Sequence, residues 1–412
     1  MYEIKPEVFK LSNGLRVVYQ HAPAQVAHLG VTILAGSSYE KQNEVGLAHY
    51  LEHCIFKGTN KRKAYHILSR LDSVGGEINA YTTKEEIAIY ASFTKEHLKR
   101  SSELLADITL NSSFPEKEIN KEKEVIIDEI NSYLDSPTDR IVDDFEYHLF
   151  KNHSLGNNIL GTKESVNNFT RLDLLNYVSE LFTVENIVIS FVGDITKKKL
   201  TKILESDFKN CSKVSLSRGV FSFTGYKPFR IREKLSNYQS HAMIGGLAPS
   251  HTDKHRKSVS LLINILGGPA MNSRLNLSVR ERYGYSYTIE SNYTSFVDTG
   301  YWAVYFGTDL KYLNRTLDIV YKELKLLREK KMGVLQLKAA KEQFKGHLAL
   351  SLDNNSGLML GLGKSMLLFN QIDTIEEINE SINRLTAEDL LEAANIYFKP
   401  ETISELIFES EK

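Results

Sequence analysis

The sequence repeats itself once, and this repeat limits the fold to two similar halves. Two segments, RLDLLNYVSELFTVENIVISFVG from Arg171 and AEDLLEAANIYFKPETISELIFE from Ala387, share Asp-Leu-Leu, a later Phe and a Glu-x-Ile at one constant offset. Earlier segments align in the same order if small insertions are allowed, with LEHCIFKGT over LINILGGPA and KEVIIDEINSYLD over KEQFKGHLALSLD. Because ordered self-similarity marks repeated structural units, we interpret the chain as an internal duplication.

Length and pattern agree with two domains. A chain of 412 residues is too long for one ordinary core. Strand-like runs (GLRVVYQ and HLGVTILAG) precede helical runs expected from about Gly46, over 64–74, over 95–110 and over 115–134, which indicates an α/β or α+β half. We predict domains at 1–210 and 235–412, with a Ser/Lys-rich linker at 211–234. The run GLMLGLGKSMLLF from Gly357 lacks the spacing of a phosphate-binding loop and is predicted to be a packed helix.

Composition excludes several classes of function. Acidic and basic residues nearly cancel, 52 against 51, which argues against a nucleic-acid partner and against a membrane-surface partner. The first residues form neither a secretory signal nor a transit peptide, and no window approaches the roughly 18 apolar residues of a membrane span. Two cysteines exclude a disulfide framework, so a cytoplasmic setting is expected.

The segment GLAHYLEHCIFKGT places three polar groups in an apolar, helix-like run. His49 and His53 are four residues apart, so on a helix both lie on one face and could bind one zinc ion at about 2.0–2.1 Å. Glu52 lies beside them, where its carboxylate would reach a metal-bound water. A pair of helical histidines is also common on solvated surfaces. The aligned positions of the other half carry Val, Leu and Ile, as expected if the trio is catalytic and not structural.

A hydrolytic zinc site needs a third protein ligand. Glu122 and Glu129 are two helical turns apart on one stripe of EKEVIIDEINSYLD, with Ile126 between them. Either glutamate fits, and a solvated acidic helix face would have the same pattern. A closed structural site with Cys54 as fourth ligand is disfavoured, because a residue next to His53 lies about 100° further round the helix.

These residues resemble the pitrilysin/insulinase family of zinc peptidases, the inverzincins. HYLEH, the later Glu129 and the blocks LDSVGGEINAYTTKEEIAIY, HSLGNNILGT, ILGGPAMNSRL and VRERYGYSYTI occur in the family's order. The chain is similar in size to the short two-domain form, including bacterial processing-protease-like proteins and mitochondrial processing peptidase subunits. The resemblance implies an α+β fold with two homologous domains, each a mixed β-sheet covered by helices, which face each other across a chamber.

The resemblance also implies roles for individual residues. One Zn²⁺ per chain would be bound by His49, His53 and Glu129, with Glu52 as the general base. Glu122 would orient a ligand histidine from outside the metal's own ligand set.

The resemblance further implies how a substrate binds. Asn79 and Ala80 match the strand edge that pairs with the substrate backbone. Arg280 and Tyr287 match the pair that holds the substrate carbonyl and stabilises the oxyanion.

The sequence therefore predicts a zinc metalloendopeptidase that hydrolyses unfolded peptides or short polypeptides. The alternative is a non-catalytic peptide-binding or scaffold subunit of a processing-peptidase-like complex. Association into a homodimer, or into a heterodimer with a related subunit, is compatible with either function.

Overall fold

The computed structural model describes residues 4–213 and 222–411, which form two compact units. Unit 1 contains residues 4–131, 157–213 and 349–375. Unit 2 contains residues 132–156, 222–348 and 376–411. Within the described residues, no helix has both the length and the apolar character required to cross a membrane.

Unit 1 is built on a six-stranded sheet in the order β1-β2-β6-β3-β5-β4. β2 and β6 are parallel and all other neighbours are antiparallel, so the sheet is mixed. The strands are β1 (Glu7–Lys10), β2 (Arg16–His21), β3 (Val26–Ile33), β4 (Glu77–Thr82), β5 (Ile87–Thr94) and β6 (Ile187–Gly193). β4 ends the sheet, and no other strand of the described residues pairs with its outer edge.

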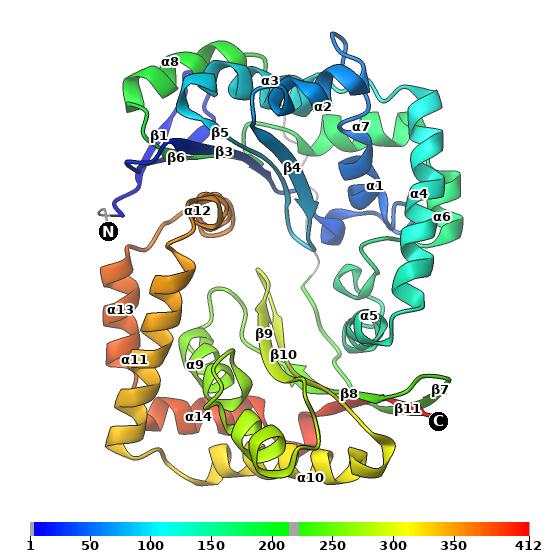
Figure 1. Cartoon of the computed structure of the whole chain (residues 1–412), viewed down its shortest axis with the longest axis vertical. Coiled ribbons are helices and arrows are strands. Elements are labelled where there is room, and N and C mark those ends of the chain that lie inside the picture. The colour runs from blue at the N-terminus through cyan, green and yellow to red at the C-terminus, as the bar shows by residue number, and fades with distance from the viewer. Residues whose placement is uncertain (1–3, 214–221, 412) are drawn as a thin grey trace. The chain divides into compact units, whose positions relative to one another are not determined.

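The helices of unit 1 cover both faces of this sheet (Figure 1). They are α1 (Leu47–Cys54), α2 (Ala64–Asp72), α3 (Leu98–Leu110), α4 (Glu116–Leu134), α6 (Lys163–Asn168), α7 (Arg171–Leu181), α8 (Lys197–Asp207) and α12 (Asn355–Phe369). The run of β6, which is apolar apart from Ser190, is buried at every residue. Ile189 belongs to the core shared with α1, α3 and α8, whereas Val188 packs in a second core with α12. A strand buried on both faces needs no polar alternation.

Unit 2 repeats the same strand order. Its sheet runs β7-β11-β8-β10-β9, with β7 and β11 parallel and the remaining pairs antiparallel. The strands are β7 (Arg230–Leu235), β8 (Ser240–Leu247), β9 (Ile289–Ser295), β10 (Gly300–Thr308) and β11 (Ser404–Ser410). The helices are α5 (Pro137–Leu149), α9 (Arg256–Gly267), α10 (Leu310–Glu329), α11 (Val334–Ser351), α13 (Ile375–Arg384) and α14 (Ala387–Tyr397). This order matches β2-β6-β3-β5-β4 of unit 1, as the predicted duplication requires.

Each half of the sequence contributes one helix to the other unit. The predicted continuous domains at 1–210 and 235–412 did not include this exchange. α12 lies in the C-terminal half of the chain, after most of the residues of unit 2, yet it packs on β6 and β3 of unit 1 (Figure 1). α5 lies in the N-terminal half, yet it packs on β8 and β11 of unit 2. Each sheet has a second apolar face that must be covered by another layer. The other half of the chain supplies that layer in both units.

The predicted linker at 211–234 also differs from the structure at its C-terminal end. β7 begins at Arg230 and pairs with β11, so the second sheet starts before residue 235. Four of the six residues of β7 (RIREKL) are charged, as is common in edge strands, so the segment resembles a polar linker in the sequence. Residues 214–221 of the predicted linker lie outside the described residues. The predicted chamber between the two domains stays a prediction.

The close fit of α12 on the sheet depends on Gly363. A Cβ atom at this position would lie 2.6 Å from Thr32 Oγ1 and 2.9 Å from Ser190 Oγ, which is closer than real Cβ contacts. We therefore expect Gly363→Ala to destabilise unit 1 by about 1–3 kcal/mol, the usual cost of overpacking. The midpoint of thermal unfolding should fall.

Gly361→Ala is the matched control, because nothing lies within 4 Å of a Cβ there. It should stabilise the helix by about 1 kcal/mol. Equal effects of the two changes would contradict this account of the packing.

Candidate metal centre

α1 carries the predicted His-x-x-Glu-His group and is fixed at its N-terminus. Gly46 precedes the helix with φ of 95°, in the left-handed region that favours glycine. The backbone N–H groups of Gly46 and Ala48 donate to the carboxylate of Glu40, at 3.0 and 2.8 Å. Oxygen acceptors suit this end of a helix because the N-terminal N–H groups have no partner within the helix, and burial raises the pKa of Glu40 to about 8. The Tyr50 hydroxyl donates to the carbonyl of Ile119 at 2.7 Å and so ties α1 to α4.

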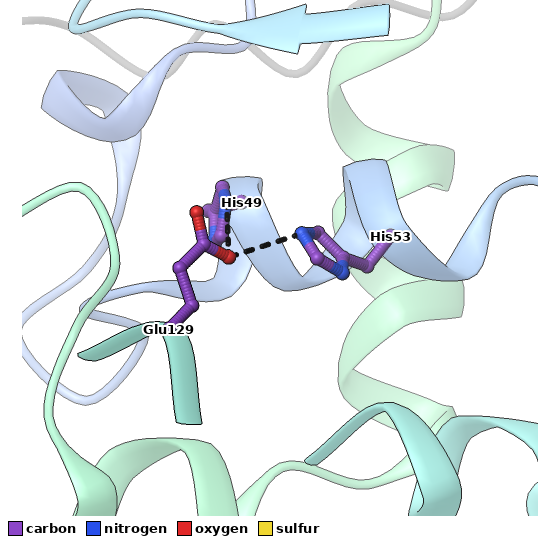
Figure 2. A group of neighbouring side chains, drawn as sticks. All are labelled: His49, His53 and Glu129. Atoms are coloured by element: carbon purple, nitrogen blue, oxygen red, sulfur yellow. Dashed lines mark ion pairs between the residues drawn. The ribbon is translucent and has the colours of Figure 1, made fainter. Parts of the chain in front are cut away.

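Three predicted ligands meet in unit 1 (Figure 2). The carboxylate of Glu129 on α4 faces both imidazoles of α1, and one oxygen, Oε2, lies 3.8 Å from His49 Nε2 and 3.5 Å from His53 Nε2. One ligand atom of each residue lies within 4.8 Å of the other two. Histidines four residues apart on a helix were predicted to share a face, and their ring centroids are 4.7 Å apart. This cluster combines two nitrogen donors with one carboxylate oxygen.

The geometry of the cluster fits a zinc ion. Tetrahedral zinc with bonds of about 2.0–2.1 Å places its ligand atoms roughly 3.3 Å from one another. The two nitrogen-to-oxygen distances of 3.5 and 3.8 Å are close to that spacing, so small side-chain movements would suffice. Three protein ligands would leave the fourth position open, as in catalytic zinc sites. Cys54 is buried in the apolar core of unit 1 and is not part of the cluster.

Two of the three groups in the cluster, His49 and Glu129, have pKa values shifted toward the forms that bind a metal ion, whereas His53 must lose a proton to do so. Burial lowers the pKa of His49 to about 4, which leaves its imidazole neutral at neutral pH. Burial acts in the same direction on His53, but hydrogen bonds and negative charge from Glu129, Glu52 and Glu122 together outweigh it and raise the pKa of His53 above its usual value. The same hydrogen bond lowers the pKa of Glu129. A neutral imidazole and an ionised carboxylate are the forms that bind metal ions.

Glu122 is placed outside the cluster, in contact with the far side of one ligand. Its Oε2 lies 3.4 Å from His53 Nδ1, whereas His53 Nε2 faces Glu129. Its other oxygen accepts from the ammonium group of Lys57 at 2.8 Å. Carboxylates in this position fix the tautomer and orientation of a ligand histidine. The structure therefore separates two glutamates that residue spacing alone left equivalent.

Replacing Glu122 by Gln should weaken zinc binding about 10–100-fold, because the neutral amide holds the His53 ring less firmly. Competition with a zinc-binding dye measures the dissociation constant. Glu124→Gln provides the control on the same helix, since Glu124 is exposed. An unchanged constant in Glu122→Gln would show that Glu122 does not position His53.

Glu52 lies beside the cluster, at the end of the edge strand. The Thr82 hydroxyl, in the last residue of β4, donates to Glu52 Oε2 at 2.7 Å. Burial raises the pKa of Glu52 although the bond from Thr82 opposes the shift. A carboxylate that is more basic than usual is suited to accept a proton from water.

Asn79 and Ala80 lie on β4, whose outer edge pairs with no strand in the part of the chain that the structure describes. The N–H of Ala80 donates to Asn79 Oδ1 at 2.9 Å. α1 packs against β4, which brings this edge close to the cluster. The predicted pairing of a substrate strand here stays a prediction.

Arg280 and Tyr287 belong to unit 2, where they lie together. Arg280 is in a π-helical turn over Asn276–Glu281, and its guanidinium carbon lies 4.7 Å from the centre of the Tyr287 ring. The Tyr287 side chain is 79% exposed, so its hydroxyl is available to a ligand. Their predicted role at the cluster of unit 1 stays a prediction.

Sequence reasoning missed three residues around the cluster, namely Glu40, Lys57 and Thr82. Glu40 and Lys57 flank the His-x-x-Glu-His segment, and an acidic residue shortly before a helix is a known N-terminal signal. Thr82 is separated from Glu52 by α2 and a turn, so no local pattern links the two residues.

Comparisons with known proteins find similar zinc proteases. The family model described as Insulinase (Peptidase family M16) matches residues 16–163, and the one described as Peptidase M16 inactive domain matches residues 168–344. The chain is 33% identical over 383 residues to "Uncharacterized zinc protease YmxG" of Bacillus subtilis, with 92% of each chain covered. It is 30% identical over 403 residues to an "Uncharacterized zinc protease" of Rickettsia bellii, with 97% of each covered.

Two solved structures have the same fold. A Pseudomonas fluorescens structure described as a peptidase M16 inactive domain has a TM-score of 0.92 at 18% identity, with 99% of each chain covered. A protease from Helicobacter pylori has a TM-score of 0.88 at 21% identity, with 98% of this chain and 100% of the other covered.

Proposed function

The chain belongs to the insulinase family, peptidase family M16, and from this premise we propose that it is a zinc-dependent endopeptidase acting on unfolded peptides and short polypeptides. The predicted family and two-domain α+β fold are thereby confirmed. The names of the relatives support a zinc protease. The observation that carries the proposal is the convergence of His49, His53 and Glu129 on one point.

The proposed mechanism assigns the proton transfers to Glu52. Zinc would be held by His49, His53 and Glu129, and when bound it supplies a Lewis acid that polarises the scissile carbonyl and acidifies water. The Glu52 carboxylate would take the proton of the attacking water and later pass it to the leaving amine. The hydrogen bond from Thr82 holds one oxygen of that carboxylate. The other oxygen is then left for the water.

Substrate binding would use the edge of β4 and the pair from unit 2. An extended peptide would add to the free edge at Asn79 and Ala80, and backbone hydrogen bonds would then provide affinity for many sequences. Arg280 and Tyr287 would donate to the oxyanion, and loss of one such donor costs about 10²–10³ in rate. A location in the cytoplasm and association into dimers stay predictions.

Metal removal tests the proposed function. We expect the purified full chain to contain about one zinc ion, and we expect a chelator to abolish cleavage of a mixed library of unstructured peptides. Zinc added after removal of the chelator should restore cleavage, because the ligands remain in place. Mass spectrometry of the products measures both the cleavage and the cut sites.

The result that contradicts the proposal is a zinc-loaded protein that binds these peptides without cutting them. That outcome would favour a non-catalytic peptide-binding or scaffold subunit. Cleavage that persists at full rate in the metal-free protein would exclude the zinc mechanism.

A further inference from the structure

A second feature of unit 1 lies close to the metal centre but is not used by the mechanism. A surface cavity of about 790 Å³ is bordered by residues 57–66 and by Pro115, Lys117 and Glu118 at the start of α4. Five of the residues that line it are basic: Lys57, Lys61, Arg62, Lys63 and Lys117. We call it the lysine cavity.

Two of these basic groups are neutralised by acids of unit 1. The guanidinium of Arg62 binds Glu103 at 2.7 Å and also pairs with Asp107. Lys57 is paired with Glu122, the carboxylate that contacts His53. The acidic residue that lines the cavity, Glu118, is paired with Lys121 at 3.1 Å. None of these pairs reduces the charge of the other lysines.

Three ammonium groups remain without an acidic partner in the described part of the chain. Lys61, Lys63 and Lys117 are exposed, and within residues 4–213 and 222–411 none of their ammonium groups forms an ion pair or a hydrogen bond to a side chain. Charges of one sign around a cavity concentrate counter-ions there. The lysine cavity therefore attracts anions, although the whole chain has a net charge of −1.

The available donors indicate which anions fit. A planar carboxylate is best recognised by the fork of an arginine, but Arg62 is already occupied by Glu103 and Asp107. Lysine ammonium groups act as point charges and suit multivalent oxyanions such as phosphate. The positive charge gathers in one cavity and does not form the extended stripe of a nucleic-acid site.

The cavity is connected to the metal centre through one side chain. Lys57 borders the cavity, and its ammonium group holds one oxygen of Glu122 at 2.8 Å. The other oxygen of Glu122 lies 3.4 Å from His53 Nδ1. An anion in the cavity would attract Lys57 and leave more negative charge on Glu122. Glu122 would then be a stronger acceptor for His53.

We propose that the lysine cavity binds a small phosphate-bearing anion, and that this anion strengthens the hold of the protein on zinc through Lys57 and Glu122. The inference that the anion binds depends on the lysine cavity alone. The effect on zinc rests on the proposed metal centre.

Calorimetric titration of the zinc-loaded full chain with inorganic phosphate, at constant ionic strength, tests the binding. We expect Lys61→Ala/Lys63→Ala to weaken phosphate binding at least tenfold. Lys202→Ala/Lys209→Ala is the matched control, because it removes the same charge from exposed positions of unit 1 outside the cavity. It should change the constant less than twofold. The absence of binding, or equal losses in the two double variants, would overturn the site.

Vesicles distinguish a free phosphate from a lipid headgroup. Vesicles of phosphatidylcholine with phosphatidylglycerol should sediment no more protein than vesicles of phosphatidylcholine alone. Sedimentation that Lys61→Ala/Lys63→Ala abolishes, without binding of free phosphate, would overturn the proposal in favour of a lipid surface.

Zinc release to an excess of chelator tests the connection. Phosphate should slow release by a factor of up to about 10, compared with chloride at equal ionic strength, since altered partners of a ligand act on this scale. Lys57→Met should remove the difference while phosphate still binds. An equal effect of phosphate in Lys57→Met would overturn the connection. Because this measurement follows metal and not cleavage, its failure is distinct from failure of the proposed peptidase activity.

Discussion

Replacing Glu52 by Gln is expected to slow peptide cleavage about 10²–10⁴-fold while zinc stays bound, because an amide cannot accept the proton of the attacking water. Gln has nearly the same shape, and its amide oxygen can still accept the hydrogen bond from Thr82. The effect should therefore appear in kcat with little change in KM. Steady-state kinetics on one peptide, together with metal analysis of the same preparation, measures both quantities.

A variant of Glu52 that cuts peptides at the unaltered rate would show that another group accepts the proton. Loss of zinc from the same variant would show instead that Glu52 is a ligand. Thr82→Val is a useful companion, since it removes the hydroxyl that holds Glu52 Oε2. It should slow cleavage less than Glu52→Gln, because the carboxylate remains.

Replacing Glu129 by Ala should weaken zinc binding by more than the roughly 10–100-fold expected from Glu122→Gln, because a direct ligand is lost. Cleavage should be lost together with the metal. Thermal unfolding gives a measurement that does not depend on activity. At zinc concentrations about 100 times the dissociation constant, bound metal stabilises a protein by about 2.7 kcal/mol. Zinc should therefore raise the unfolding midpoint of the unaltered chain and leave that of Glu129→Ala unchanged.

Asp128→Ala is the control for Glu129→Ala. Asp128 precedes Glu129 on α4 and is exposed, so its loss should change neither zinc binding nor cleavage. Equal losses of zinc in the two variants would indicate that the charge of α4 matters and that direct ligation by Glu129 does not.

Much of the fold could be predicted from patterns of neighbouring residues. The duplication is visible in the sequence because both copies keep the same order of short local signals, and the two sheets share their strand order. The apolar run of β6 predicts a strand buried on both faces. The exchange of α5 and α12 has no such signal. Both helices carry apolar residues, and any exposed apolar sheet face would suit them.

The site divides in the same way. His49 and His53 are four residues apart, and this spacing places both on one face of any helix. The sequence is therefore sufficient to predict that they lie together. The choice between Glu122 and Glu129 is different. They are about 10 Å apart along α4, so they cannot both contact one ion. Which of them faces His53 Nε2 depends on how α4 lies against α1, a contact that includes the bond from Tyr50 to Ile119.

The sequence by itself determined the twofold plan, the histidine pair and the neighbouring Glu52, because each follows from helix or strand periodicity within a short segment. Residue spacing left Glu122 and Glu129 equivalent until the family resemblance favoured Glu129, and only the tertiary structure shows that Glu129 faces both histidines, that Thr82 contacts Glu52 and that Gly363 lies against Thr32. Those contacts join residues that are distant in the chain, and they follow from how whole helices and strands pack together.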